Sequence, residues 1–131
     1  MSKVFLGGTC NDSTWRDRLM PMLKMDYFNP VVDDWDEAAQ AKEEEEKENA
    51  DFQLYVITPL MTGVFSIAEA VECSNKKPDS CVFVILAEDD SKTFTKGQMK
   101  SLIATAKLIE NNGGSVFSSL EKAAEFLNSK V

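Results

Sequence analysis

One residue whose type and position could support covalent chemistry is Glu69, in the first turns of a helix expected to begin near Val64. The dipole and free N–H groups of a helix N-terminus stabilise the ionised form of a carboxylate. An ionised carboxylate in a partly apolar pocket is a nucleophile suited to the anomeric carbon of a sugar. Glu69 is therefore a candidate for forming a covalent glycosyl–enzyme.

The same segment also has a purely structural interpretation. Ser66-Ile67-Ala68-Glu69 matches a capping box, in which the glutamate side chain bonds back to the backbone of its own N-cap. From the sequence, both interpretations stay open.

A second candidate, Glu43, lies in an acidic segment expected to form a helix over residues 36–50. Steps of four, three and four residues from Ala39 lead to Glu43, Glu46 and Ala50, which therefore share one face of that helix. The alanines indicate that this face packs against protein and turns Glu43 inward. The alternative is a solvated acidic run that is paired in part with the lysines beside it.

The composition excludes several classes of function. The chain has 22 acidic and 14 basic residues, a net charge of −8, and residues 33–51 hold ten of the acids and two lysines. A chain with this balance and no basic stripe lacks the electrostatic footprint of a protein that binds nucleic acid or an anionic membrane. Because there is no histidine, catalytic triads and metal sites that depend on imidazole are excluded.

Cysteine usage and hydropathy bear on the compartment. The three cysteines have no C-x-x-C spacing, which argues against a zinc site or a disulfide framework. No apolar run approaches the ~20 residues of a membrane span, and the N-terminal segment does not resemble a signal peptide. We expect a cytoplasmic protein.

The elements that must position these residues follow from hydropathy periodicity. Short apolar runs alternate with segments of helical period along the whole chain. The expected strands are 4–6, one around Tyr27 and Phe28, 52–57, 81–86 and 115–117. The expected helices begin after Asn11-Asp12-Ser13, span 36–50 and about 64–74, include 99–109, and begin again at Ser118 or Ser119.

Two further expectations concern the core face of the third helix and the segment after the fourth strand. In the third helix, the core face is expected to carry Val64, Ile67, Ala68 and Val71, and Glu88-Asp89-Asp90 is expected to form a loop. The five βα units predict a single α/β domain over residues 1–131, with a flavodoxin-like, doubly wound, five-stranded parallel sheet in the order 2-1-3-4-5.

Ligands of such folds bind beyond the carboxyl ends of the strands, near the switch in strand order. Here this edge includes the turn Gly7-Gly8-Thr9, whose N–H groups could hold an anion, or which could be only a tight turn. A phospho-receiver needs an aspartate after the third strand, where this chain has Thr58-Pro59, so that function is excluded. The first turn resembles a flavodoxin phosphate loop only loosely.

Four pieces of sequence, taken in order, resemble the nucleoside 2-deoxyribosyltransferase-like family, which includes nucleotide N-glycosidases. The resemblance covers about the first 85 residues. The pieces are Val4-Phe5-Leu6-Gly7-Gly8 with Trp15-Arg16, Phe28-Asn29-Pro30 with Trp35, Glu43 leading through Asn49-Ala50-Asp51 into strand 52–57, and Ser66-Ile67-Ala68-Glu69-Ala70.

The resemblance implies that Glu69 attacks C1′ of a nucleoside or nucleotide and releases the base, and that water or a second base then resolves the glycosyl–enzyme. Glu43 falls where the family has a second acid, usually aspartate, which handles the proton at the departing base or contacts the sugar hydroxyls. The resemblance implies no metal or organic cofactor, a nucleoside or nucleotide as small-molecule partner, and a homo-oligomer. The implied substrate-binding residues are Phe5, Gly7, Gly8, Thr9, Asn29, Pro30, Gly63 and Ser66.

The chain departs from the family pattern in three places. Phe5 stands where many members have a tyrosine near the nucleophile, and Gly63 stands where transferases often have an aspartate that reads the base. The family's C-terminal residues that complete a neighbour's site have no counterpart. These departures leave base preference and the choice between transfer and hydrolysis open.

The departures at Phe5 and Gly63 also favour an alternative function, a non-catalytic module that binds a nucleotide or an ADP-ribose derivative. A third possibility is a scaffold whose acidic helix meets a basic partner.

Overall fold

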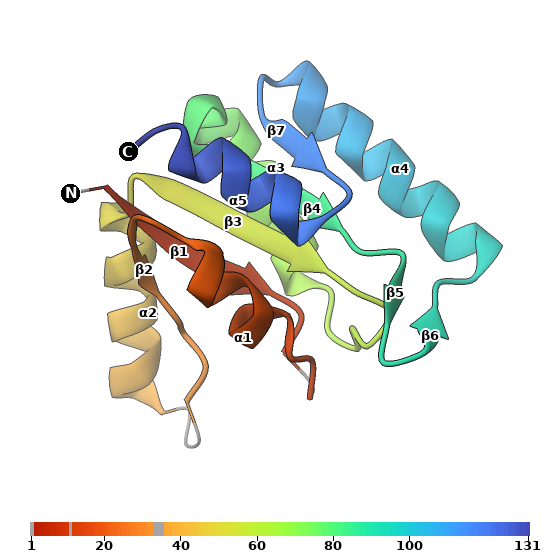
Figure 1. Ribbon diagram of the computed structural model, residues 1–131, viewed down its shortest axis with the longest axis horizontal. Helices are drawn as coiled ribbons and strands as arrows, with labels where there is room; N and C mark the ends of the chain where they lie inside the picture. Colours follow the sequence, from red (N-terminus) through yellow and green to blue (C-terminus); the bar gives the residue numbers. More distant parts are fainter. Residues whose placement is uncertain (1, 11, 33–35) are drawn as a thin grey trace.

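The main sheet contains five parallel strands in the order β2-β1-β3-β4-β7 (Figure 1). The structure, a computed structural model, describes residues 2–10, 12–32 and 36–131. The predicted order 2-1-3-4-5 is confirmed, because β7 is the fifth strand of this sheet along the chain. The strands are β1 (Lys3–Gly8), β2 (Asp26–Phe28), β3 (Phe52–Ile57), β4 (Cys81–Ile85) and β7 (Ser115–Phe117).

Helices cover both faces of this sheet (Figure 1). In β3, the fully buried Leu54 and Val56 pack in the core under α1 and α5, whereas Tyr55 and Ile57 pack in the core under α3 and α4. A strand buried on both faces is mainly apolar, and residues 52–57 fit this pattern apart from the buried Gln53. The helices are α1 (Trp15–Leu19), α2 (Glu37–Asn49), α3 (Phe65–Lys76), α4 (Lys96–Asn111) and α5 (Leu120–Asn128).

The start of α5 confirms one of the two caps expected there, because the Ser119 side chain accepts a hydrogen bond from the backbone N–H of Lys122. The N-cap expected at Asn11-Asp12-Ser13, before the first helix, is confirmed only in part. Asn11 lies outside the described residues, and α1 begins at Trp15, whose N–H donates to Ser13 Oγ at 3.4 Å.

The loop expected at residues 88–90 is wrong. Residues Glu88–Asp89 (β5) and Lys92–Thr93 (β6) form a short antiparallel hairpin. The turn between them is possible because Asp90 and Ser91 adopt positive φ angles of 50° and 63°, as a tight hairpin turn requires. The hairpin packs on α1 through Asp89, which lies 3.5 Å from Arg18 Nη2.

The core face expected for the third helix is also wrong in part. Val64 precedes α3 and is 65% exposed, and Ala68 is exposed, whereas Ala70, Cys73 and Ser74 are buried. Small side chains at these three positions let the helix lie close to the sheet. Apolar periodicity alone could not identify that face, because Val64 and Ala68 are apolar too.

Candidate active site

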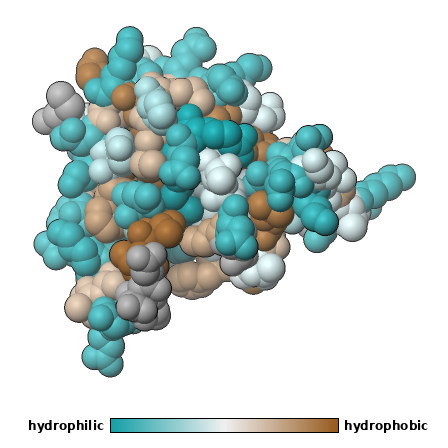
Figure 2. All heavy atoms as spheres, turned by 60° about the horizontal axis from the view of Figure 1, so that its bottom comes forward, coloured by the Kyte–Doolittle hydropathy of each residue, from teal (hydrophilic) through white to brown (hydrophobic). Residues whose placement is uncertain are grey.

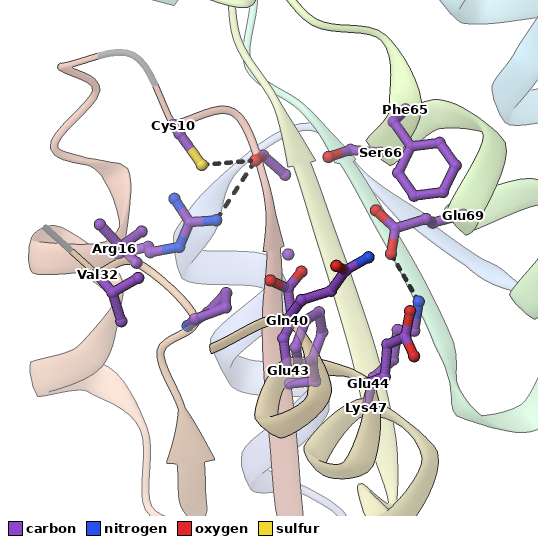
Figure 3. A pocket seen from close by; sticks show the side chains of 15 residues that line it. Cys10, Arg16, Val32, Gln40, Glu43, Glu44, Lys47, Phe65, Ser66 and Glu69 are labelled. Carbon is purple, nitrogen blue, oxygen red and sulfur yellow. Dashed lines mark hydrogen bonds and ion pairs between the residues drawn. The ribbon is translucent and has the colours of Figure 1, made fainter. Parts of the chain in front are cut away.

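A cavity of about 460 Å³ opens at the carboxyl end of β1, between the loop after β2, helix α2 and the first half of α3 (Figure 3). Its volume falls within the range of small-molecule sites. This is the edge of the sheet where ligands were expected. The lining residues are Phe5, Gly7, Gly8, Cys10, Arg16, Pro30, Val31, Val32, Gln40, Glu43, Glu44, Lys47, Phe65, Ser66 and Glu69.

Most of the residues predicted to form the site meet at this cavity. Glu43 enters it from α2 and Glu69 from α3, and five of the implied substrate-binding residues also line it: Phe5, Gly7, Gly8, Pro30 and Ser66. The two glutamates are 26 residues apart in the sequence, and the crossover from α2 through β3 to α3 brings them to the same cavity.

Three of the predicted residues are not among those that line it. Thr9 is buried, and its Oγ1 accepts a hydrogen bond from the N–H of Thr58 at 3.0 Å. Asn29 is exposed, and its Oδ1 accepts from the N–H of Val31 at 3.1 Å. Gly63 lies in open space before α3. Trp35, one of the residues that carry the resemblance, lies outside the described residues.

Glu69 is held by an ion pair and not by a capping box. The N-cap of α3 is Val64, which makes no side-chain cap, and Ser66 lies inside the helix, so the capping-box interpretation is wrong. Oε2 of Glu69 instead lies 2.9 Å from Nζ of Lys47 on α2. The Glu69 side chain is only 12% exposed, so its carboxylate forms part of the cavity wall with little access to solvent.

Helix α2 separates its acids by face, as the alanine stripe predicts. Glu43 and Glu46 are half-buried, whereas Glu44, Glu45 and Glu48 are exposed, although Glu44 also borders the cavity. Glu43 lines the cavity. Glu46 does not, because it pairs with the lysines Lys42 at 3.0 Å and Lys3 at 3.1 Å, and hydrogen bonds from these two lower the pKa of Glu46.

Arg16 organises the turn after β1. Its guanidinium is buried, and its N–H groups donate to the backbone carbonyls of Leu6 at 3.0 Å, Thr9 at 2.8 Å and Gly8 at 3.4 Å. The guanidinium also stacks 4.4 Å from the centre of the Trp15 ring. Burial lowers the pKa of Arg16 from its ordinary value, but an arginine remains charged in proteins. Arg16 thus fixes the shape of the glycine turn at the cavity.

Several lining residues were not identified from the sequence. On α2, Gln40 lies three residues before Glu43 and Lys47 lies four residues after it. Continuing the stripe of Glu43 in both directions would have found these two residues. Phe65 precedes Glu69 by one helical turn on the same face. Arg16 belongs to a motif that carries the resemblance but had no site role assigned to it. The other lining residues, Cys10, Val31, Val32 and Glu44, carry no pattern that marks them in the sequence.

Across residues 2–10, 12–32 and 36–131, no group of three or more cysteine, aspartate or glutamate residues is arranged to hold a metal ion. In the same ranges, none of the helices combines the length and the apolar composition of a transmembrane segment.

Comparison with known proteins identifies a family that the chain matches. A sequence model described as nucleoside 2-deoxyribosyltransferase like matches residues 1–90, which is more than half of the 131 residues. That match spans every residue that lines the cavity. Neither a curated protein nor a solved structure matches the chain. The chain belongs to the nucleoside 2-deoxyribosyltransferase-like family.

Proposed function

We propose that this protein cleaves or transfers the N-glycosidic bond of nucleosides through a glycosyl intermediate on Glu69. The observation that carries the proposal is the convergence of Glu69 and Glu43, from two different helices, on one cavity large enough for a nucleoside (Figure 3). Membership of the family supports the general kind of chemistry.

The proposed reaction has two steps. In the first, one carboxylate oxygen of Glu69 bonds to C1′ while the C1′–N bond breaks, and the electron pair of that bond goes to the base, which takes a proton from Glu43. In the second, water or the nitrogen of another base attacks C1′ and gives its proton to Glu43. The C1′–O bond then breaks and returns the Glu69 carboxylate.

The other residues that line the cavity suit the base and the sugar of a nucleoside. Phe5, Val31, Val32 and Phe65 supply apolar surface for the faces of a planar base, and Gln40 and Ser66 supply hydrogen-bonding groups for sugar hydroxyls or base edges. Ligand sites of this class combine a mainly apolar lining with a few placed polar groups.

The direct test is a panel of deoxynucleosides and their 5′-monophosphates, incubated with the protein and assayed for free base by chromatography. We expect release of base from at least one member, and a new nucleoside when a second base is added if the protein is a transferase. We expect Glu43→Gln to lower the rate about 100-fold, because the departing base loses its proton donor. Glu45→Gln is the matched control, since Glu45 is exposed on the same helix.

The alternative function gives a different result in this experiment. A module that only binds nucleotides or ADP-ribose derivatives would show heat of binding in calorimetry and would leave the ligand intact. Its supporting observation is that the Glu69 carboxylate is already paired with Lys47. Tight binding with no free base across the whole panel would contradict the enzymatic proposal.

We also propose that the protein forms a homo-oligomer. Apolar side chains are unusually exposed around the cavity mouth: Val31 51%, Val32 48%, Val64 65% and Phe65 72%. Apolar patches also interrupt the largely hydrophilic face in Figure 2. Contiguous exposed apolar surface marks interaction sites. We expect sedimentation velocity to show a dimer or larger assembly that Phe65→Ser weakens. A monomer at a concentration of about 50 μM, well above the Kd of a specific dimer, would contradict this proposal.

A further inference from the structure

The ion pair between Lys47 and Glu69 differs from a surface salt bridge in its shielding. The two side chains are 27% and 12% exposed, whereas those of Lys76 and Glu72, the i,i+4 pair on α3, are 71% and 67% exposed. Shielding from water strengthens the attraction between opposite charges. The pair also joins residues that are 22 positions apart, so that it links α2 to α3 across the wall of the cavity.

The backbone of Lys47 is itself anchored to the sheet. Its carbonyl accepts a hydrogen bond from Nε2 of Gln53 at 3.3 Å, and Oε1 of that glutamine accepts from the hydroxyl of Tyr55 at 2.7 Å. Gln53 and Tyr55 are both buried in β3. The last turn of α2 also receives a bond from Nζ of Lys77 to the carbonyl of Glu48 at 3.0 Å. These hydrogen bonds therefore hold the backbone from which the Lys47 side chain extends toward Glu69.

The surrounding charges keep Lys47 protonated. Burial alone would lower the pKa of Lys47, but the hydrogen bond and charge of Glu69, followed by the charges of Glu43 and Glu72, outweigh it and raise the pKa. The charged or titratable side chains that line the cavity with Glu69 are Lys47, Glu43 and Glu44 from α2, Arg16 from α1 and Cys10. Tyr55 of β3 interacts electrostatically with Glu69, and Glu72 of α3 does so with Lys47. Among the described residues, Lys47 is the cation that forms an ion pair with Glu69.

Within the described residues, Lys47 donates a hydrogen bond to Glu69 and no hydroxyl does, although the hydroxyl-bearing Ser66 also lines the cavity. Phe5, which lines the cavity, has none, and the Tyr55 hydroxyl donates to Gln53. Within residues 2–10, 12–32 and 36–131, no hydrogen bond is made to Oε1, the other oxygen of Glu69. Figure 3 shows that this oxygen points away from Lys47.

We infer that Lys47 is a positioning residue that holds Glu69 through Oε2, leaves Oε1 to bond with C1′, and stabilises the carboxylate when the intermediate breaks down. This inference rests on the proposed function. When Oε1 bonds to C1′, Glu69 becomes a neutral ester and Lys47 loses its counter-charge. When water or a second base breaks the C1′–O bond, the electron pair returns to Glu69, and the ammonium stabilises the departing carboxylate. Lys47 therefore assists the second step most.

The experiment compares Lys47→Met, which removes the charge at similar length, with Lys47→Arg, which keeps it. Lys42→Met is the matched control, because Lys42 lies on the same helix and pairs with Glu46 outside the cavity. Thermal unfolding of each variant confirms that it is folded. The kinetic readouts are kcat, the pH profile of kcat/KM, and the fraction of glycosyl–enzyme in the steady state, measured by intact-protein mass spectrometry after an acid quench.

For Lys47→Met we expect kcat to fall about 100-fold, the magnitude found when one preorganised electrostatic partner is removed. The glycosyl–enzyme should accumulate, because its breakdown is slowed. The fall in kcat/KM that deprotonation of Lys47 causes at alkaline pH in the wild type should be absent, because methionine has no charge to lose. Lys47→Arg should restore most of the rate, and Lys42→Met should match the wild type.

A Lys47→Met variant that has the same kcat and pH profile as Lys42→Met would overturn the inference while leaving the proposed function intact. Failure of the wild-type protein to release base would instead overturn the proposed function. The contact between Lys47 and Glu69 is then tested by titrating the ¹³Cε chemical shift of Lys47 by NMR. The Glu69 carboxylate raises the pKa of Lys47, so we expect that signal to titrate at lower pH in Glu69→Gln than in the wild type. An unchanged titration would overturn the inference.

Discussion

Replacement of Glu69 by glutamine is expected to abolish release of base, with a fall in rate of about 1,000-fold or more. Loss of the nucleophile from other covalent enzymes has effects of this size or larger. The amide keeps the size and a hydrogen-bond acceptor for Lys47, so the fold is expected to stay intact. Chromatographic assay of free base from the best nucleoside of the panel measures the change.

The matched control for this variant is Glu72→Gln. Glu72 lies on the same helix, but its side chain is 67% exposed and pairs with Lys76 at 3.2 Å. Its replacement should leave the rate within about twofold, as a change at an exposed surface pair normally does. Glu69→Gln with wild-type activity, or equal losses in both variants, would refute the assignment of the nucleophile.

The second large effect is expected from Gly8→Ala, on stability. Gly8 ends β1 with a φ of 119°, and a Cβ there would overlap the carbonyl oxygen of Val56 in β3. Both the left-handed backbone and the overlap with a neighbouring strand are unfavourable, and together they should cost about 3 kcal/mol. With a urea m-value of ~2 kcal/mol/M, the midpoint of unfolding should fall by about 1–2 M.

Gly63→Ala is the control for this loss of stability. Gly63 does not have a positive φ, and a Cβ built there has no heavy atom within 4 Å. We expect its midpoint to stay the same or to rise slightly, because alanine restricts the unfolded chain. Equal midpoints for the two variants would mean that β1 and β3 do not approach each other as closely as described.

The architecture could be predicted because it depends on patterns that the chain repeats. The near-continuous apolar run of residues 81–86, which contains β4, predicts burial on both faces. The alternation of strands and helices predicts a parallel sheet with its ligand edge at the carboxyl ends. The inward turn of Glu43 also follows from local spacing, since Ala39 and Ala50 mark its face of α2. These features require no knowledge of which distant residues meet.

The parts that could not be predicted depend on contacts between distant segments. The alternative of a solvated acidic helix would pair Lys47 with acids of its own helix, but Lys47 pairs with Glu69, 22 residues later, because the crossover brings α2 beside α3. Arg16 has the sequence context of a surface residue and is buried because the carbonyls of the glycine turn bend around it. The capping box of Ser66 was wrong for a related reason, since the N-cap is Val64, two residues before Ser66, and Glu69 pairs with Lys47 instead.

The most direct test of the central claim is to trap the covalent intermediate. A 2′-fluoro-substituted nucleoside destabilises the oxocarbenium-like transition states of both steps and lets the glycosyl–enzyme accumulate. After digestion, mass spectrometry should locate one added sugar on the peptide that contains Glu69, and the adduct should be absent from Glu69→Gln. An adduct on Glu43 or another residue, or release of base from an active wild type with no adduct on Glu69, would contradict the account.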